Sequence, residues 1–83
     1  MYHLFVATPD KVYFDDDVIS LIAPGTVGSF EILSHHAPFI SSLKKGPLTI
    51  TDKNHRRFTW NITGGFFEMS DNKATLLADS VQE

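Results

Sequence analysis

The chain has 83 residues, a formal net charge of −3 and no cysteine. A chain of this length has room for one hydrophobic core, so residues 1–83 are predicted to form a single domain. The lack of cysteine excludes disulfides, thiolate nucleophiles and cysteine-based zinc sites and favours a reducing compartment, and the acidic balance argues against general nucleic-acid binding.

Apolar and polar residues alternate in several short runs, which is the pattern of half-buried β-strands. In chain order, these runs are residues 2–7, 18–23, 48–51 and 57–63. In the second run, the alternation places Val18, Ser20 and Ile22 on one face. Turn residues such as those in Pro24-Gly25 and Gly64-Gly65 separate the runs. No segment of ten residues has helical periodicity, so we predict seven to ten strands in a small antiparallel sandwich or barrel, without a substantial helix.

Two clusters in the first third of the chain invite a ligand-binding interpretation. Asp15-Asp16-Asp17 lacks the alternating oxygens, the glycine and the terminal glutamate of a calcium loop, so we predict a solvated turn or an edge strand. The segment from Gly25 to Gly28 has neither the lysine nor the following helix of a phosphate loop. We expect its glycines to supply unusual backbone angles.

A double histidine, His35-His36, stands in the sequence GSFEILSHHAPF. In an extended strand the two rings would point to opposite faces and could not converge on one ion, and His3 and His55 lie at no ligand spacing from them. Glu31 has no partner constellation for acid/base chemistry with a histidine. We therefore predict no metal, no cofactor and no catalytic residue, with one ring packed and the other exposed.

Six of the seven lysines and arginines lie in residues 44–73. One interpretation is a free-standing β-barrel that binds nucleic acid through the basic region 44–57 together with Trp60. The strand alternation argues against it, because it places Phe58 and Trp60 opposite Arg57, as in a solvated hairpin. A salt-sensitive shift of an oligonucleotide would favour the nucleic-acid interpretation.

The order of motifs along nearly the whole chain resembles the N-terminal domain of the ε subunit of bacterial F-type ATP synthases. The resemblance implies a flattened β-sandwich of about ten mostly antiparallel strands. The motifs are Thr8-Pro9-Asp10-Lys11 followed by Phe14, then Pro24-Gly25-x-x-Gly28-x-Phe30-x-Ile32-Leu33-x-x-His36-Ala37-Pro38, Leu43-Lys44-x-Gly46-x-Leu48-x-Ile50, Gly64-Gly65-Phe66-x-Glu68 and Asn72-x-x-Thr75-x-Leu77-Ala78-Asp79.

The same resemblance implies a non-catalytic subunit of the rotor, or central stalk, which is not an enzyme and has no cofactor. Such a subunit binds γ and rests on the polar loops of the c-ring, so that ion-driven rotation is coupled to ATP synthesis. It meets the α3β3 head only indirectly and reaches the membrane only through the complex, at the cytoplasmic face of the bacterial inner membrane. It has no nucleic-acid partner.

The resemblance also assigns two groups of contact residues. The residues that it turns toward the c-ring are Ser29, Phe30 and Glu31. The residues that it turns toward γ are Thr8, His36, Ala37, Pro38, Phe39 and Ser41. Of the neighbours Phe39 and Ile40, alternation predicts that one points inward and the other outward, without deciding which.

The chain departs from the family pattern in the loop that carries these residues. Glu31 stands where the family usually has glycine, and Ser34-His35 where it often has Pro-Gly. The loop therefore loses easy access to positive φ, and we expect a different path or a strain of about 1 to 2 kcal/mol. We also expect Glu83 to be the natural end, as in short family forms without the helical inhibitory arm.

Overall fold

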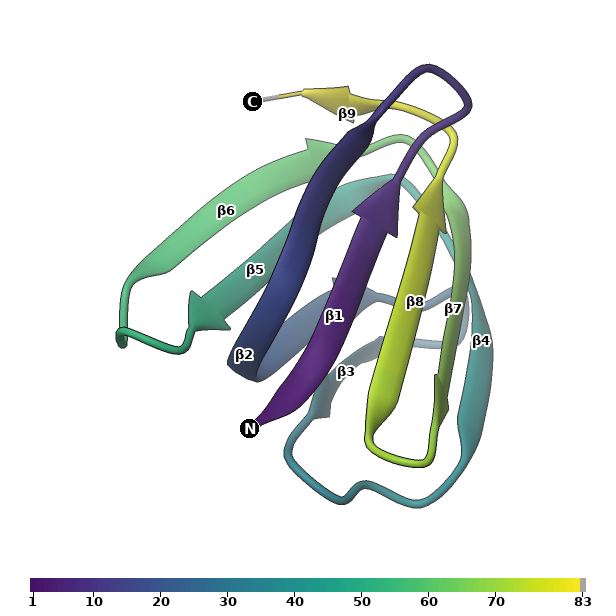
Figure 1. Ribbon diagram of the computed structural model, residues 1–83. Coiled ribbons are helices and arrows are strands. Elements are labelled where there is room, and N and C mark those ends of the chain that lie inside the picture. Colours follow the sequence, from purple (N-terminus) through teal and green to yellow (C-terminus); the bar gives the residue numbers. More distant parts are fainter. Residues whose placement is uncertain (83) are drawn as a thin grey trace.

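The computed structural model describes residues 1–82 of the chain. These residues fold into nine β-strands and contain no helix (Figure 1). The all-β prediction is confirmed, with nine strands against about ten expected. The strands are β1 (Tyr2–Ala7), β2 (Val12–Pro24), β3 (Ser29–Ile32), β4 (Phe39–Leu43), β5 (Gly46–Asp52), β6 (Arg57–Ile62), β7 (Gly65–Ser70), β8 (Lys73–Ala78) and β9 (Val81–Gln82).

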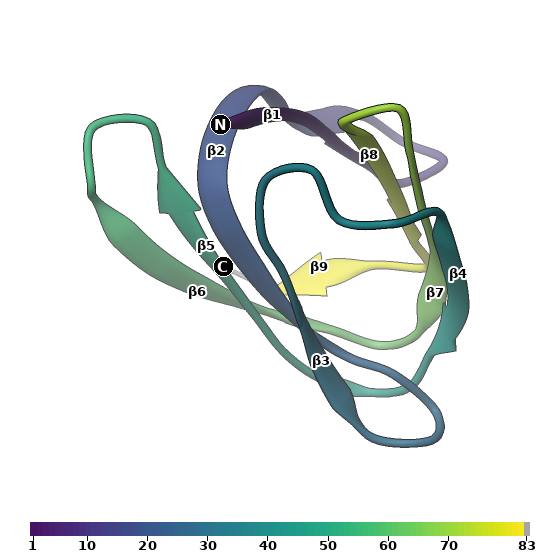
Figure 2. The same ribbon diagram turned by 90° about the horizontal axis from the view of Figure 1, so that it is seen from below.

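The strands form one continuous sheet in the order β4-β7-β8-β1-β2-β5-β6-β9, with β3 also paired to β2. The 13-residue β2 belongs to both halves of the sheet, because residues 12–18 pair with β1 and residues 18–24 pair with β3 and β5. The sheet curls along this strand (Figure 2). We name β4, β7, β8, β1 and the first half of β2 the first layer, and the remaining strands with the second half of β2 the second layer.

The arrangement is the flattened, mostly antiparallel sandwich that the resemblance implies. The pairs are antiparallel except for β1 with β8, which run parallel. The described part measures 26 × 25 × 19 Å, so it is thinnest in one direction.

The core lies between the two layers and is built from alternate residues of each strand. In β1, Tyr2, Leu4 and Val6 are buried whereas His3 is exposed. The Tyr2 hydroxyl donates a hydrogen bond of 2.8 Å to the Ile32 carbonyl, so its polar end is satisfied inside the core. The largest fully buried side chains are Tyr2, Phe67, Leu4, Leu21, Ile32, Leu48, Ile50, Ile62, Met69, Leu76, Val6 and Val18.

A shift of pairing register inside β2 corrects one part of the predicted pattern. The shift lies between Val18 and Ser20, in the pairing with β5. Val18 is buried before it, and Leu21 and Ala23 are buried after it. The prediction that Val18, Ser20 and Ile22 share a face is therefore wrong, because a bulge adds one residue to one strand and turns the following side chains over.

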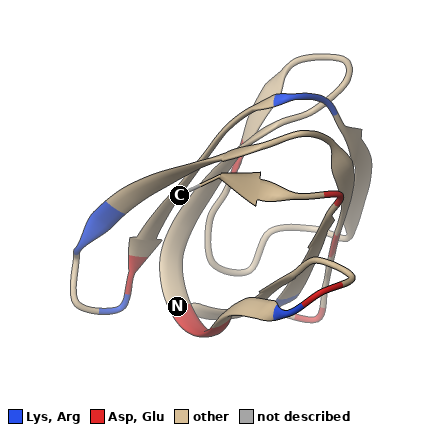
Figure 3. Ribbon diagram, turned by 90° about the horizontal axis from the view of Figure 1, so that it is seen from above, with Lys and Arg blue, Asp and Glu red and all other residues tan. Residues whose placement is uncertain are grey.

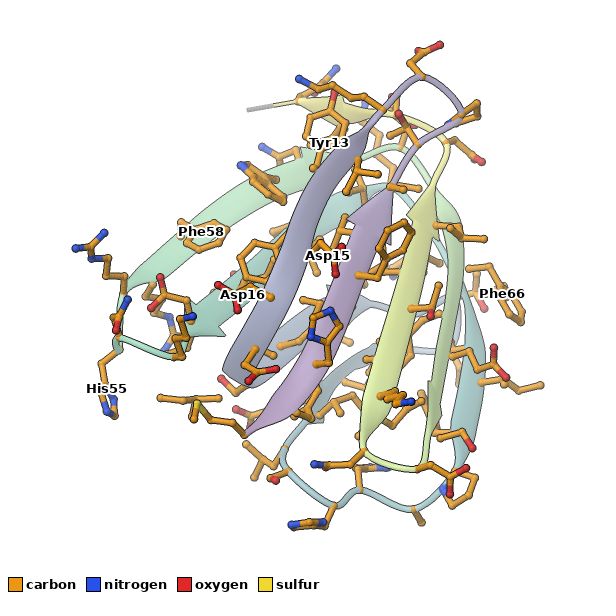
Figure 4. The ribbon with its side chains drawn as sticks, viewed as in Figure 1. Tyr13, Asp15, Asp16, His55, Phe58 and Phe66 are labelled. Atoms are coloured by element: carbon orange, nitrogen blue, oxygen red, sulfur yellow. The ribbon has the colours of Figure 1, made fainter. Side chains whose placement is uncertain are left out.

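The three consecutive aspartates lie within β2 and not in a turn. Their segment pairs with β1 on one edge, and β5 joins the other edge only from Val18 onward. The edge-strand alternative is therefore confirmed for this half of β2. Asp15 and Asp16 project to opposite sides of the strand, toward β1 and toward β5 (Figure 4).

Gly25 and Gly28 bound the turn between β2 and β3, but the expectation of unusual backbone angles is wrong. The described glycines with positive φ are Gly64 and Gly65. Gly25 is needed for close approach instead, because a Cβ there would lie 2.6 Å from the Gly28 carbonyl oxygen. The compact turn lets Gly25 form a bridge with Leu43 of β4, which joins the two layers at one corner.

Candidate interaction surface

The outer face of the first layer carries a patch of exposed apolar side chains. Ile40 on β4, Phe66 on β7 and Leu77 on β8 are 66%, 46% and 49% exposed. Phe66 pairs with Leu77, and Ile40 pairs with Glu68, which follows Phe66 on the same face of β7. Paired residues and residues two apart share a face, so we name these three side chains the apolar face. Phe66 projects away from the sandwich (Figure 4).

The sequence of β7 and β8 explains why these side chains are exposed. Each strand contains an apolar doublet, Phe66-Phe67 in β7 and Leu76-Leu77 in β8. Neighbours in a strand point to opposite faces, so one member of each doublet must lie outside. Phe67 and Leu76 are fully buried, which leaves Phe66 and Leu77 on the surface. The predicted site residues did not include this pair; the doublets indicate that one member of each must lie outside, but not which one.

An open pocket of about 600 Å³ adjoins the apolar face. It forms where β1 ends, β7 begins and β8 ends. Gly65 allows β7 to approach β8 closely beside the pocket, because its φ is 147° and a Cβ there would clash with the Leu77 carbonyl oxygen. The pocket is lined by Ala7, Thr8, Pro9, Leu43, Gly65, Phe66, Leu77, Ala78 and Asp79.

Thr8 of the predicted γ-facing group lies at this pocket, and its polar atoms are engaged in its own turn. The Thr8 amide donates to the Lys11 carbonyl at 2.9 Å. Its hydroxyl oxygen accepts from the amides of Asp10 and Lys11 at 3.2 and 3.4 Å. The β1–β2 turn is thereby held in one shape, and the Thr8 hydroxyl oxygen is already engaged within it.

The other residues of the predicted γ-facing group occupy the loop before β4 and β4 itself. His36, Ala37 and Pro38 are exposed in the loop. The His36 ring donates from Nδ1 to the Ala37 carbonyl at 2.7 Å and meets the Phe39 ring edge at a centroid distance of 5.7 Å. In β4, Ile40 points outward.

Phe39 and Ser41 lie on the opposite, inward side of β4, where both are half-buried. The predicted split of Phe39 and Ile40 is therefore confirmed, and Phe39 is the inward member. Ser41 donates its hydroxyl to the Ser42 carbonyl at 2.8 Å. As a result, Ile40 rather than Phe39 belongs to the outer face of this strand.

The residues that the resemblance turns toward the c-ring lie on β3, at the edge of the second layer. Ser29 and Glu31 are exposed and Phe30 is half-buried, as alternation requires. Phe30 lies 4.9 Å from Phe39 and 5.3 Å from Phe67, measured between ring centroids. These three rings connect the two predicted groups of contact residues inside the sandwich. The negative charge of Glu31 also adds to burial in raising the pKa of the Tyr2 hydroxyl.

The β3–β4 loop passes through His35 in a left-handed conformation, with a φ of 61°. This position is one where the family often has glycine, so the chain takes the strained alternative that we expected. The His35 amide donates to Asn72 Oδ1 at 2.8 Å, and Asn72 Nδ2 donates to the Met1 carbonyl at 2.9 Å. The Asn72 side chain therefore ties the loop to the start of β1 and to the β7–β8 turn.

The double histidine lies in this loop and not in a strand, so the strand geometry that we used to exclude a shared ion does not apply. Both His35 and His36 are exposed, whereas we expected one ring to be packed and the other exposed; the His36 ring contacts that of Phe39. Among residues 1–82, no three histidine or carboxylate side chains come together in a way that could hold a metal ion.

The basic residues do not form the single region that nucleic-acid binding would use. Lys44 and Lys45 precede β5, whereas Lys53, Arg56 and Arg57 follow it, and seven residues of strand span about 20 Å. The two groups appear as separate blue segments in Figure 3. Lys53 pairs with the Asp16 carboxylate at 3.1 Å.

The pKa of Asp16 is held below its usual value by the Asp17 amide and by the Lys53 ammonium group. Phe58 and Trp60 pack against each other at 5.2 Å and against Phe14 and Tyr13, rather than presenting free ring faces.

Residues 1–82 contain no helix, and therefore none that could span a membrane.

The sequence matches one family along its whole length. The family is described as the β-sandwich domain of the ATP synthase δ/ε chain, and the match covers residues 1–83. The chain belongs to this family. Its sandwich is thus that of an ATP synthase δ/ε-type domain, as the resemblance implied.

Similar proteins include ATP synthase ε chains of several bacteria. The ε chain of Protochlamydia amoebophila is 44% identical over 82 residues, which are 99% of this chain and 56% of that protein. The ε chains of Chlorobium limicola and Chlorobaculum tepidum are 45% and 41% identical, over 96% of this chain and 91% of each protein. The chain thus spans about half of one relative and nearly all of the other two.

Two solved structures have the same fold. One is the central stalk and c-ring of the Tetrahymena thermophila mitochondrial ATP synthase, with a TM-score of 0.84 and 23% identity, over 98% of this chain and 65% of the matched one. The other is the Euglena gracilis mitochondrial ATP synthase, with a TM-score of 0.87 and 18% identity, over 94% of this chain and 50% of the matched one. At these identities the likeness concerns the fold.

Proposed function

We propose that the chain is a non-catalytic rotor subunit of a bacterial F-type ATP synthase, which binds γ and rests on the c-ring. The observation that carries this proposal is the apolar face of Ile40, Phe66 and Leu77, which a rigid sheet exposes next to the loop of His36. Family membership supports it. The subunit would act at the cytoplasmic face of the inner membrane and would influence the α3β3 head only through γ.

The γ contact would centre on the apolar face and the adjoining pocket. Phe66 is the natural anchor, since aromatic residues near the centre of an interface often carry much of the binding energy. Ile40 continues the surface toward His36, Ala37 and Pro38, so that the loop would form its rim. Phe39 and Ser41 would contribute indirectly, by shaping β4 from its inner side.

The c-ring contact would use the exposed side of β3. Ser29 and Glu31 point outward there, and Phe30 anchors the strand inside through Phe39 and Phe67. Polar loops of a ring offer donors to a carboxylate, so Glu31 would set much of the attraction and its salt dependence. The two contacts would then lie on different layers, joined by β2.

A binding measurement with purified γ tests the proposal. We expect micromolar or tighter binding, and a loss of about 30-fold or more for Phe66→Ser combined with Leu77→Ser, because a hot-spot loss of about 2 kcal/mol has this effect. The matched control is Val27→Ser, which removes a fully exposed apolar side chain from the β2–β3 turn. Wild-type protein that does not bind γ at micromolar concentration would refute the proposed function.

A nucleic-acid function is not favoured by the arrangement of the basic residues. The bases at each end of β5 lie too far apart to follow one short stretch of backbone, and Lys53 is paired with Asp16. An oligonucleotide shift at low salt, with Arg56→Ala plus Arg57→Ala as comparison, remains the direct measurement for that alternative.

A further inference from the structure

A histidine between two aspartates lies on the same outer face of the first layer. His3 Nε2 is 2.5 Å from Asp15 Oδ1, and His3 Nδ1 is 3.2 Å from Asp17 Oδ1. The register explains the contact, because His3 pairs with Asp17 and the next outward residue of β1, Phe5, pairs with Asp15. The three side chains connect β1 to β2 outside the backbone hydrogen bonds, and we name them the histidine clasp.

The clasp is complete only when the histidine is protonated. An imidazolium has two N–H groups and can donate to both carboxylates, whereas a neutral ring has one N–H and one acceptor nitrogen. When the ring is neutral, one carboxylate therefore faces a lone pair. The Asp15 hydrogen bond is the main reason that the pKa of His3 is raised, although partial desolvation opposes it and Asp17 adds to it.

The other charged groups around His3 do not take its place as the donor to both carboxylates. Lys73 of the parallel strand β8 is the register partner of His3, and the His3 amide donates to the Asn72 carbonyl at 3.4 Å. Asp16 points to the other side of β2, where it is paired with Lys53. The carboxylates contact opposite ring nitrogens, so the clasp cannot gather around one metal ion.

The clasp lies close enough to the apolar face to affect a partner seated there. Four residues further along β1 from His3, Ala7 pairs with Leu77 of the apolar face. A standard interface buries about 800 Å² per partner, which is comparable with the whole 26 × 25 Å face of the molecule. A partner centred on Phe66 and Leu77 therefore covers the clasp or lies at its edge.

We propose that the histidine clasp makes docking on the apolar face dependent on pH, with tighter binding when His3 is protonated. This inference rests on the proposed function. The protonated clasp carries one net negative charge and the neutral clasp carries two, and removing the second charge from water opposes docking. The stabilisation of the folded clasp by protonated His3 is fully present below the pKa that a histidine has in the unfolded chain. It is lost as the pH rises through the raised pKa of His3 in the folded chain.

Two measurements on the whole chain test the inference. In an NMR titration, the His3 ring is expected to titrate above 6.5, and Asp15→Asn with Asp17→Asn is expected to return it toward 6.5. The affinity for purified γ is expected to fall several-fold from pH 6 to pH 8.5 in the wild type. In His3→Gln this change is expected to disappear, since glutamine stays neutral.

The matched control is His55→Asn, at the tip of the β5–β6 hairpin, where asparagine tolerates the left-handed φ of 64°. It is expected to keep the wild-type pH dependence. An equal pH dependence in His3→Gln, or a stronger affinity at high pH in the wild type, would overturn the inference while leaving the proposed function intact. If neither the wild type nor His3→Gln bound γ at any pH, the proposed function itself would fail, and the inference with it.

Discussion

Phe30 and Phe39 connect the two proposed contact surfaces, so their mutual contact can be measured as a coupling energy. The rings meet edge to face, with centroids 4.9 Å apart and planes at 63°. Such a pair contributes about 0.5 to 1.5 kcal/mol beyond the area that it buries. We expect Phe30→Leu and Phe39→Leu each to cost about 1 to 1.5 kcal/mol, and the double variant to cost about 1 kcal/mol less than their sum.

Urea unfolding followed by the fluorescence of Trp60, the single tryptophan, provides the assay. The total stability of a domain of this size is about 4 to 12 kcal/mol, so all variants should remain folded. The control cycle combines Phe30→Leu with Phe58→Leu, whose rings have different partners. Additivity within about 0.3 kcal/mol for Phe30 and Phe39 would refute the reasoning, as would equal coupling in the control cycle.

Three further predictions concern single positions. Gly65→Ala is expected to cost about 2 to 5 kcal/mol, because φ is 147° and the new Cβ would meet the Leu77 carbonyl, and a fall of 10 °C or more in Tm would check this. Tyr2→Phe is expected to cost about 1 to 2 kcal/mol in urea unfolding, since it leaves the Ile32 carbonyl without its buried donor. Glu31→Lys is expected to weaken co-sedimentation with membranes that carry the c-ring several-fold at low salt, and no change there would contradict the proposed role of β3.

The all-β class was predictable because the alternation in β1, β5 and β6 reflects burial on one side. Phe58 and Trp60, for example, pack against the core on the face opposite Arg57, as predicted. The pattern failed at Val18, where a bulge shifts the register, since a bulge depends on the partner strand and leaves no mark in the alternation itself.

The candidate surface was only partly predictable for related reasons. The resemblance predicts a contact at the loop around His36, whereas Phe66 and Leu77 were not predicted because an apolar doublet does not reveal which member faces outward. The tie between Asn72 and the His35 amide joins positions 37 residues apart, so no local pattern indicates it. Its only local sign is that both residues stand where the chain needs a left-handed conformation.

The parallel pairing of β1 and β8 has a consequence for how the chain reaches its fold. This pairing brings His3 beside Lys73, although 70 positions separate them. Contacts between such distant positions form slowly, because a long loop must close before they contribute. During synthesis, β1 can pair early with β2, but its other edge has no partner until residues 73–78 of β8 have left the ribosome. The first layer is therefore closed only after β8 is available, and until then the free edge of β1 is exposed to wrong pairing.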